Sequence, residues 1–212
     1  MKAITKGPEP TSLKAHRLSP NSNYDNYAGK DDLRHALVTE QRGLCCYCMC
    51  RIRNQSTAMK IEHWQCQAHH TAEQLAYRNL LGACLGGHGQ PGHLQHCDTK
   101  KGDLDLRRNP ADPAHRIEAR VRYEPDGTIR ADEASFDNHL NDVLNLNLAR
   151  IKNNRRSVLT ALLEWWRTSK RPVPRARIKR EIAKRTNTAG ALTPYCQVAV
   201  WWLRAKLAGR LS

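Results

Sequence analysis

Residues 44–64 read LCCYCMCRIRNQSTAMKIEHW, and this stretch decides what kind of fold the chain can form. It opens with Cys45 and Cys48, which are separated by two residues, and it closes on an acid followed directly by a histidine, Glu62-His63. A Cys-x-x-Cys turn lets two thiolates hold one tetrahedral metal ion. Its last six residues, MKIEHW, are predicted to form a short strand. The stretch therefore indicates a metal-stabilised fold around a carboxylate and a histidine.

The cysteines indicate one metal site rather than a set of disulfides. Seven of the eight lie between Cys45 and Cys97, and the first ten residues, MKAITKGPEP, lack the apolar segment of a secretory signal. A reducing, cytoplasmic setting is therefore expected, where clustered thiols bind metal more often than they form disulfides. Cys84 and Cys97 are expected to join Cys45 and Cys48 in a four-thiolate site, a ligand set that suits structural Zn2+.

The spacing of the late cysteines leaves other ligand sets open. Twelve residues separate Cys84 from Cys97, and this segment is rich in Gly and His. Three further cysteines are alternative ligands, namely Cys46, Cys50 and Cys66. The histidines of the segment are alternatives to either late cysteine, namely His88, His93 and His96.

The composition indicates a globular protein with a modest core. Of 212 residues, 40% are hydrophobic and 26% are charged, with a single Phe and a mean hydropathy of -0.71. No stretch approaches the roughly 20 apolar residues needed to span a bilayer. The sequence therefore predicts no association with a membrane.

The net charge of +15 is concentrated in the last third of the chain. Residues 1–149 hold 19 Lys and Arg against 18 Asp and Glu, whereas residues 150–212 hold 16 against 2. A phosphate backbone or an acidic protein surface is the natural partner of such a block. The candidates for contact with nucleic acid are Arg155, Arg156, Arg177, Lys179 and Arg180.

The pattern of apolar residues predicts an α+β fold with a mostly helical, basic C-terminal region. We expect an N-terminal arm over 1–30, a core with the zinc site over 31–110, a β-hairpin connection over 111–135 and a helical region over 136–212. Within these segments the sequence predicts a helix over 31–41, helix or turn over 71–81, and a hairpin over 119–130. A helical period runs from about residue 136 until prolines interrupt it, and two further helices follow.

Four motifs in order resemble those of the HNH (ββα-metal) nucleases. They are the Cys-x-x-Cys turn, the Glu62-His63 pair, Asn79, and the closing segment Cys97-Asp98-Thr99-Lys100-Lys101. Three further segments are similar to the PtuB-like branch of Septu and retron-type antiphage defence, namely Met1 to Pro8, Glu40-Gln41 before the first cysteines, and Leu144-Asn145-Leu146-Asn147. The resemblance is most specific over residues 40–103. The longer spacing between the last two cysteines departs from the family pattern and keeps His96 as a rival ligand.

The chemistry of phosphodiester hydrolysis gives each of these residue types a role. A histidine with a pKa near about 6.5 accepts a proton from water at neutral pH, which is the role expected of His63. Glu62 and Asp98 are the expected oxygen ligands of a divalent ion, Mg2+ or Mn2+. The resemblance implies that Asn79 orients His63. Lys100 and Lys101 are candidates for contact with phosphate.

The resemblance also implies partners and leaves a second function open. A PtuA-like ATPase is the expected partner, and a retron system would add its reverse transcriptase and the DNA-RNA hybrid. The expected substrate is nucleic acid, either DNA or else tRNA or other RNA, and nothing in the sequence selects between them. A non-catalytic zinc-finger module that binds nucleic acid or a protein is the second hypothesis. The paired tryptophans of the C-terminal region are expected to lie in a helical core with a basic outer face.

Overall fold

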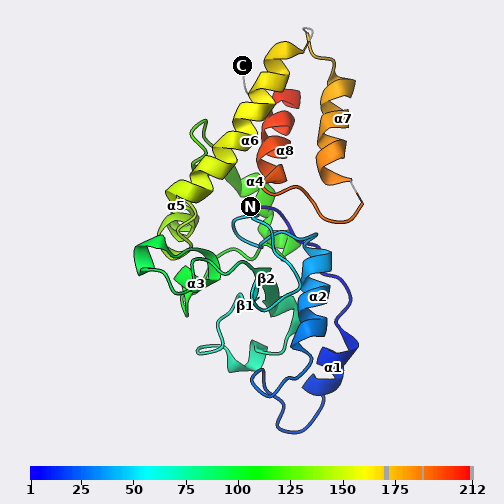
Figure 1. The fold of residues 1–212 in the computed structure, drawn as a ribbon, viewed down its shortest axis with the longest axis vertical. Coiled ribbons are helices and arrows are strands. Elements are labelled where there is room, and N and C mark those ends of the chain that lie inside the picture. The colour runs from blue at the N-terminus through cyan, green and yellow to red at the C-terminus, as the bar shows by residue number, and fades with distance from the viewer. Residues whose placement is uncertain (170–171, 188, 211–212) are drawn as a thin grey trace.

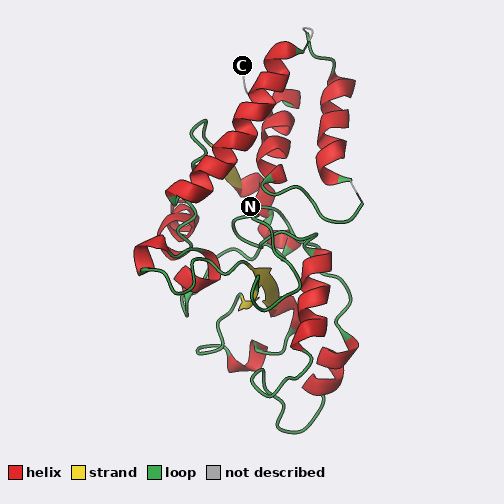
Figure 2. Ribbon diagram, in the orientation of Figure 1, coloured by secondary structure: helices red, strands yellow, loops and turns green. Residues whose placement is uncertain are grey.

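The computed structural model describes residues 1–169, 172–187 and 189–210. Three helices, α6, α7 and α8, form one end of the long axis, and the opposite half holds β1, β2, α1 and α2 (Figure 1). Helices dominate, and the strands form two separate two-stranded sheets (Figure 2). The part of the α+β expectation that concerns mixed structure and a helical C-terminal region is confirmed.

The N-terminal third contains two helices, α1 (Thr11–Arg17) and α2 (Lys30–Glu40). The helix predicted over 31–41 is confirmed. Asp31 and Asp32 lie in its first turn, where carboxylates interact favourably with the helix dipole. The expectation of an N-terminal arm over residues 1–30 did not include α1, because Leu13 is the one buried residue of this seven-residue helix. A single apolar position gives no helical period to detect.

The first sheet pairs β1 (Lys60–His63) with β2 (Leu80–Ala83) in antiparallel register, so that Glu62 lies opposite Leu81. The strand predicted over 59–64 is confirmed. Residues 71–81 form two short 3-10 turns, Thr71–Glu73 and Tyr77–Asn79, and then enter β2. All four residues of β2 are buried, and a short apolar run of this kind does not distinguish a strand from a helix.

The helix α3 (Cys97–Lys101) follows the sheet after a loop that contains the 3-10 turn Gly92–Leu94. The order β1, β2, α3 is therefore strand, strand, short helix along the chain. The cysteine turn before β1 makes only an isolated bridge between Leu44 and Arg51.

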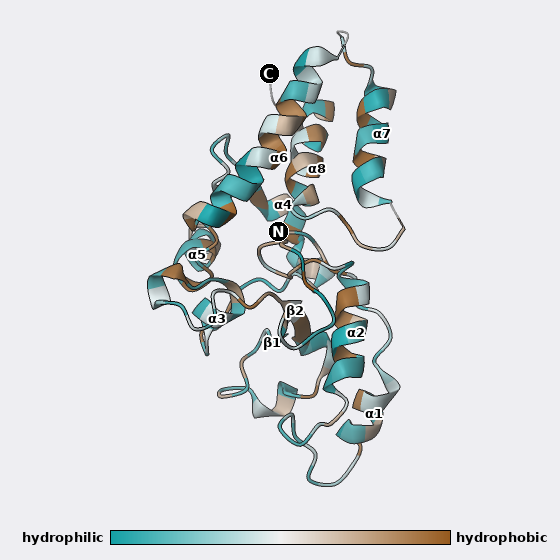
Figure 3. Ribbon diagram, viewed as in Figure 1, coloured by the Kyte–Doolittle hydropathy of each residue, from teal (hydrophilic) through white to brown (hydrophobic). Residues whose placement is uncertain are grey.

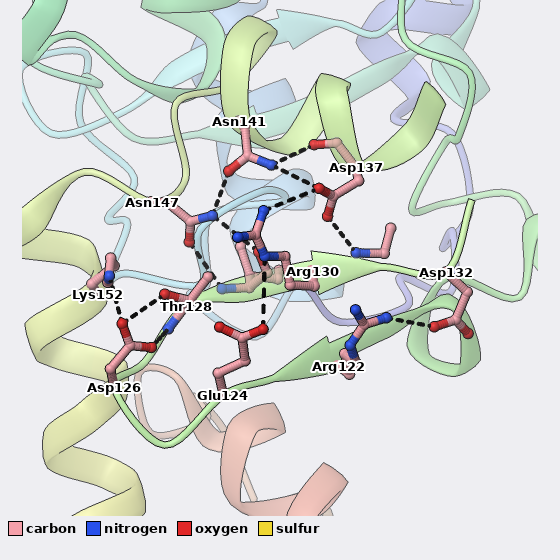
Figure 4. Close-up of polar contacts among 12 residues, drawn as sticks. Arg122, Glu124, Asp126, Thr128, Arg130, Asp132, Asp137, Asn141, Asn147 and Lys152 are labelled. Atoms are coloured by element: carbon pink, nitrogen blue, oxygen red, sulfur yellow. Dashed lines mark hydrogen bonds and ion pairs between the residues drawn. The ribbon is translucent and has the colours of Figure 1, made fainter. Parts of the chain in front are cut away.

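The second sheet is the hairpin of β3 (Val121–Tyr123) and β4 (Ile129–Ala131), which confirms the hairpin predicted over 119–130. It is preceded by the turn Pro113–His115 and by α4 (Ile117–Arg120). The side chain of Asn147 bonds both backbone groups of Ile129, with N···O distances of 2.9 and 3.0 Å. Lys152 reaches Asp126 in the hairpin turn, so the hairpin is fixed to the start of α6 (Figure 4).

The C-terminal region consists of α5 (Ala134–Asn138), the π-helical turn His139–Val143, α6 (Ala149–Thr168), α7 (Arg175–Thr186) and α8 (Cys196–Leu207). The helical period expected from residue 136 is interrupted at Asn145, whose φ is +48°. Helix α8 packs against both α6 and α7 and is far more apolar than α7 (Figure 3). None of the helices in the described ranges has the length and apolar character to cross a membrane.

The tryptophans of this region line the helix contacts. Trp166 meets Trp202 edge to face, with ring centroids 5.1 Å apart, and Trp201 meets Tyr123 of β3 in the same way. Trp165 contacts Trp166 with its ring tilted by 55° and lies under the guanidinium of Arg177. The aromatic rings therefore join α6, α8 and the second hairpin, as a helical core requires.

Candidate metal centre and catalytic site

Four buried cysteines meet at one point between the cysteine turn, the end of β2 and the start of α3. They are Cys45, Cys48, Cys84 and Cys97, and their sulfur atoms all lie within 4.8 Å of one another. The Sγ atoms of Cys45 and Cys97 are 3.9 Å apart, and those of Cys48 and Cys84 are 3.8 Å apart. Tetrahedral zinc with Zn–S bonds of about 2.3 Å holds its sulfurs about 3.8 Å apart. The thiols therefore fit a structural Zn2+ ion.

The segment before α6 holds the fourth cysteine in place despite the long insertion. The backbone N–H of Cys97 donates to the carbonyl of Leu144. The amide of Asn145 donates to the carbonyls of Gln95 and His93, at 2.8 and 3.1 Å. Since the inserted loop is held at its end by a distant part of the chain, its length does not displace Cys97.

The alternative ligands lie outside this group of four. Cys46 and Cys66 are buried and Cys50 is half-buried, and among the described residues none of the three belongs to the metal-binding group. His88 and His93 are exposed in the loop. His96 is buried beside the thiols, with its Nδ1 atom 3.2 Å from the Sγ of Cys97.

His96 is positioned to support the metal centre rather than to complete it. Its Nε2 atom lies 3.0 Å from the guanidinium of Arg150. A guanidinium only donates hydrogen bonds, so Nε2 is the acceptor and the ring proton is on Nδ1. That proton faces the Cys97 sulfur, which is the arrangement of an outer-shell donor to a metal-bound thiolate.

Glu62 is the most buried acid of the site. Its carboxylate forms an ion pair with Lys101 at 3.0 Å, and both side chains are 1% exposed. The hydroxyl of Tyr47 donates to the same carboxylate oxygen at 2.6 Å. Burial raises the pKa of Glu62 well above its ordinary value, and the nearby carboxylate of Asp98 raises it further, whereas Lys101 opposes this shift. Each of the two carboxylates therefore disfavours the charged form of the other.

Asp98 faces the mouth of the site from α3. Its carboxylate lies 3.2 Å from the ammonium of Lys60, and these side chains are 20% and 30% exposed. Lys60 and Glu62 point to the same side of β1 because alternate residues of a strand do. The site therefore contains two carboxylates and two lysines, with one ion pair buried and the other partly open to solvent.

His63 ends β1 with its ring held on two sides. Its Nε2 atom donates to the carbonyl of Gln74 at 3.0 Å, and the ring of Tyr24 packs edge to face at 4.4 Å. With the proton on Nε2, the neutral ring carries its lone pair on Nδ1. Burial lowers the pKa of His63 below its ordinary value, and the charge of Lys101 adds to this effect. The ring is therefore a neutral base at physiological pH.

Asn79 closes the loop that follows His63. Its side-chain oxygen accepts from the backbone N–H of Gln65 at 2.8 Å, and its amide donates to the carbonyls of Gln65 and Glu73. The backbone carbonyl of Asn79 accepts from Trp64. These hydrogen bonds give the buried Asn79 a structural role, because they fix the turn beside His63.

The predicted phosphate contacts divide into exposed and buried residues. Arg156, Lys179 and Arg180 are exposed, and Lys100 and Arg177 are partly buried. The expectation is corrected for Arg155 and Lys101, which are 1% and 2% exposed. Arg155 donates to the carbonyls of Gly127 and Leu146 inside the molecule, and Lys101 donates to Glu62 and to the carbonyl of His63.

The reasoning from sequence missed three residues of the site, Tyr47, Lys60 and Gln41. The amide of Gln41 bonds both backbone groups of Gly82, at 2.6 and 2.7 Å, and so joins α2 to β2. Tyr47 lies inside the Cys-x-x-Cys turn and Lys60 lies two residues before Glu62. The period of two along β1 was the available signal for Lys60.

These features define a class of protein in which four cysteines that fit one metal ion lie beside an acid-histidine pair and a short helix. No protein-family model matches the chain. The chain is similar to the Septu protein PtuB of Bacillus thuringiensis, with 29% identity over 82 residues. The aligned segment covers 39% of this chain and only 28% of the length of that relative. The similarity supports the resemblance to the PtuB-like family.

Proposed function

We propose that the chain is a metal-dependent HNH endonuclease that hydrolyses phosphodiester bonds of nucleic acid. The observation that carries this proposal is the Glu62-His63 pair at the end of β1, with Asp98 of α3 interacting with Glu62 beside the four-thiolate centre. A buried neutral histidine can act as a general base toward water, and paired carboxylates can bind the divalent ion that assists it. The similarity to PtuB supports a role as the effector of a Septu-like defence system.

The residues of the site divide the work of the reaction. Nδ1 of His63 accepts the proton of the attacking water, while the bond from Nε2 to Gln74 keeps the ring in the required tautomer. Glu62 and Asp98 would hold Mg2+ or Mn2+. When bound, this ion stabilises the charge on the phosphate and on the departing 3′-oxygen. Asn79 fixes the loop that orients His63, and Zn2+ on the four cysteines would join the cysteine turn, the end of β2 and the start of α3.

Binding of the substrate is assigned to the exposed basic residues of α6 and α7, namely Arg156, Lys179 and Arg180. DNA and tRNA are both substrates to test, because the phosphodiester is common to both. A PtuA-like ATPase is the proposed partner. A retron version of the system would add its reverse transcriptase and the DNA-RNA hybrid.

Cleavage of plasmid DNA or tRNA with Mg2+ or Mn2+, in the presence of the cognate ATPase, tests the proposal. We expect His63→Ala to abolish cutting while the fold and the zinc content are retained. His35→Ala, which removes an exposed histidine of α2, is the matched control and should cut like the wild type. Full activity of the His63 variant would remove this residue from the mechanism.

A non-catalytic zinc module that binds nucleic acid or a protein is the second candidate. The observation that favours it is that both carboxylates already have lysine partners, as acids with a structural role do. The two functions differ in one measurement, because a binding module retains nucleic acid but leaves it uncut under every metal and partner condition.

A further inference from the structure

The two lysine–carboxylate ion pairs of the site differ in their exposure to solvent. The pair of Lys101 and Glu62 is sealed from solvent, and Lys101 also donates to the carbonyl of His63 at 2.9 Å. The pair of Lys60 and Asp98 is partly open, and its 3.2 Å separation is longer. Separating a buried pair leaves an uncompensated charge, whereas an exposed pair contributes little and separates easily. Only Lys60 is therefore free to exchange its partner.

The position of Lys60 determines where its ammonium goes when the pair separates. Lys60 and Glu62 share one side of β1, and Asp98 faces them from α3. A divalent cation between the two carboxylates would compete with Lys60 for the Oδ2 atom of Asp98, because two positive charges on one carboxylate oxygen repel each other. The displaced ammonium would remain at the open edge of the site, where a phosphate bound to the same cation must also lie.

We propose that Lys60 is a placeholder that leaves Asp98 when the catalytic cation binds and then contacts the scissile phosphate. This inference rests on the proposed nuclease function and adds a substrate-binding residue to it. Lys60 thereby links occupancy of the metal site to the binding of nucleic acid. Lys101 keeps its place beside Glu62 throughout.

Binding of Mn2+ to the zinc-loaded full chain, followed by the EPR signal of free Mn2+ without nucleic acid, tests the first half. We expect Lys60→Gln to bind Mn2+ about two- to fivefold more tightly than the wild type, the range that an exposed ion pair supports. Lys60→Arg should restore the wild-type affinity. The matched control is Lys152→Gln, which breaks a remote ion pair with Asp126 and should change nothing.

Steady-state cleavage at saturating Mn2+ tests the second half. We expect Lys60→Gln to raise KM for the nucleic acid more than it lowers kcat, and Lys60→Arg to recover most of the loss. An unchanged KM would overturn the phosphate contact, since the cation site is already filled in this assay.

The outcomes separate this inference from the function on which it rests. If Asp98→Asn loses Mn2+ and Lys60→Gln binds it with wild-type affinity, the placeholder role is wrong and the metal site stands. If Asp98→Asn and the wild type give the same Mn2+ signal, both the placeholder role and the proposed catalytic metal site are wrong.

Discussion

Single residues explain both the success and the failure of the reasoning from sequence. The four ligating cysteines could be predicted because their spacing and clustering reflect one tetrahedral requirement. The burial of Lys101 could not, because lysine is exposed in most contexts and its position in the closing motif suggested phosphate. Arg155 gave a usable signal, since it interrupts the apolar stripe of its helix and faces inward with it.

Loss of Lys101 should cost stability as well as activity. Lys101→Met leaves Glu62 buried without its counter-ion, and breaking such a pair costs about 3–5 kcal/mol. Lys100→Met on the same short helix is the control, and we expect about 0.5 kcal/mol or less. Denaturant unfolding with zinc present measures both, and equal effects would contradict the assigned role of the buried pair.

The pH dependence of cleavage should report His63. Because burial lowers the pKa of His63, the ring stays neutral as the pH falls past about 6.5, the ordinary histidine value, and is protonated only below it. Activity is therefore expected to be retained at neutral pH and lost on the acid side, with a midpoint below about 6.5. A pH profile of kcat/KM measures this, and an acid midpoint at or above the ordinary value would contradict it.

His96 should affect the retention of zinc more than catalysis. Removing an outer-shell partner costs about 10–100-fold in metal affinity, and His96→Ala removes the donor to Cys97. Competition with a zinc-selective chelator measures the change. His93→Ala in the exposed part of the loop is the control, and a similar loss in both variants would point to the loop rather than to this bond.

At the level of elements, the sequence predicted those with a clear period and missed those defined by contacts elsewhere. The helix over 31–41 and the hairpin over 119–130 carry their own signals. Strand β2 does not, because its pairing with β1 and the amide of Gln41 select the extended form for a short apolar run. The break at Asn145 depends on the loop carbonyls that this residue binds.

The second hairpin should tolerate no side chain at Gly127. Its φ is +86°, and an added Cβ would lie 2.1 Å from the carbonyl of Lys152 and 2.8 Å from the amide of Arg156. Gly89 is a control with a φ of +79° and open space around it. Gly89→Ala should cost about 1–2 kcal/mol for the left-handed backbone alone. Gly127→Ala should lower the free energy of unfolding by clearly more than this, as measured by thermal unfolding. Equal losses in the two variants would show that the hairpin backbone shifts to accommodate the methyl group.

At the level of the whole molecule, charge and chemistry lie in different parts of the chain. The acids and histidine of the site belong to the β1, β2 and α3 region, whereas the last third carries the excess of basic residues. Composition could predict that imbalance, but only the packing of α6, α7 and α8 distinguishes exposed from buried basic residues.

Replacing Arg156, Lys179 and Arg180 together by Gln should weaken the binding of nucleic acid and reduce its dependence on salt. Each phosphate contact contributes about 0.9 to the slope of log affinity against log salt for duplex DNA, so a loss of up to about 3 is expected. Fluorescence anisotropy across salt concentrations measures it. Arg122→Gln, which breaks a pair with Asp132, is the control, and an unchanged slope in the triple variant would remove these three residues from the interface.

The adjacency of Cys97 and Asp98 has a consequence for the order of assembly. The last thiol is followed at once by the second acid, and the stretch between Cys48 and Cys84 carries Glu62 and His63. A chain that has not taken up zinc lacks this bridge between the segments that carry its two acids, so newly made protein is expected to be inert until the ion closes this loop. Stopped-flow addition of Zn2+ to the metal-free chain should show cutting begin only with the rise of tertiary structure. Cutting by the unloaded chain would contradict this built-in delay, which would protect the nucleic acid of the producing cell.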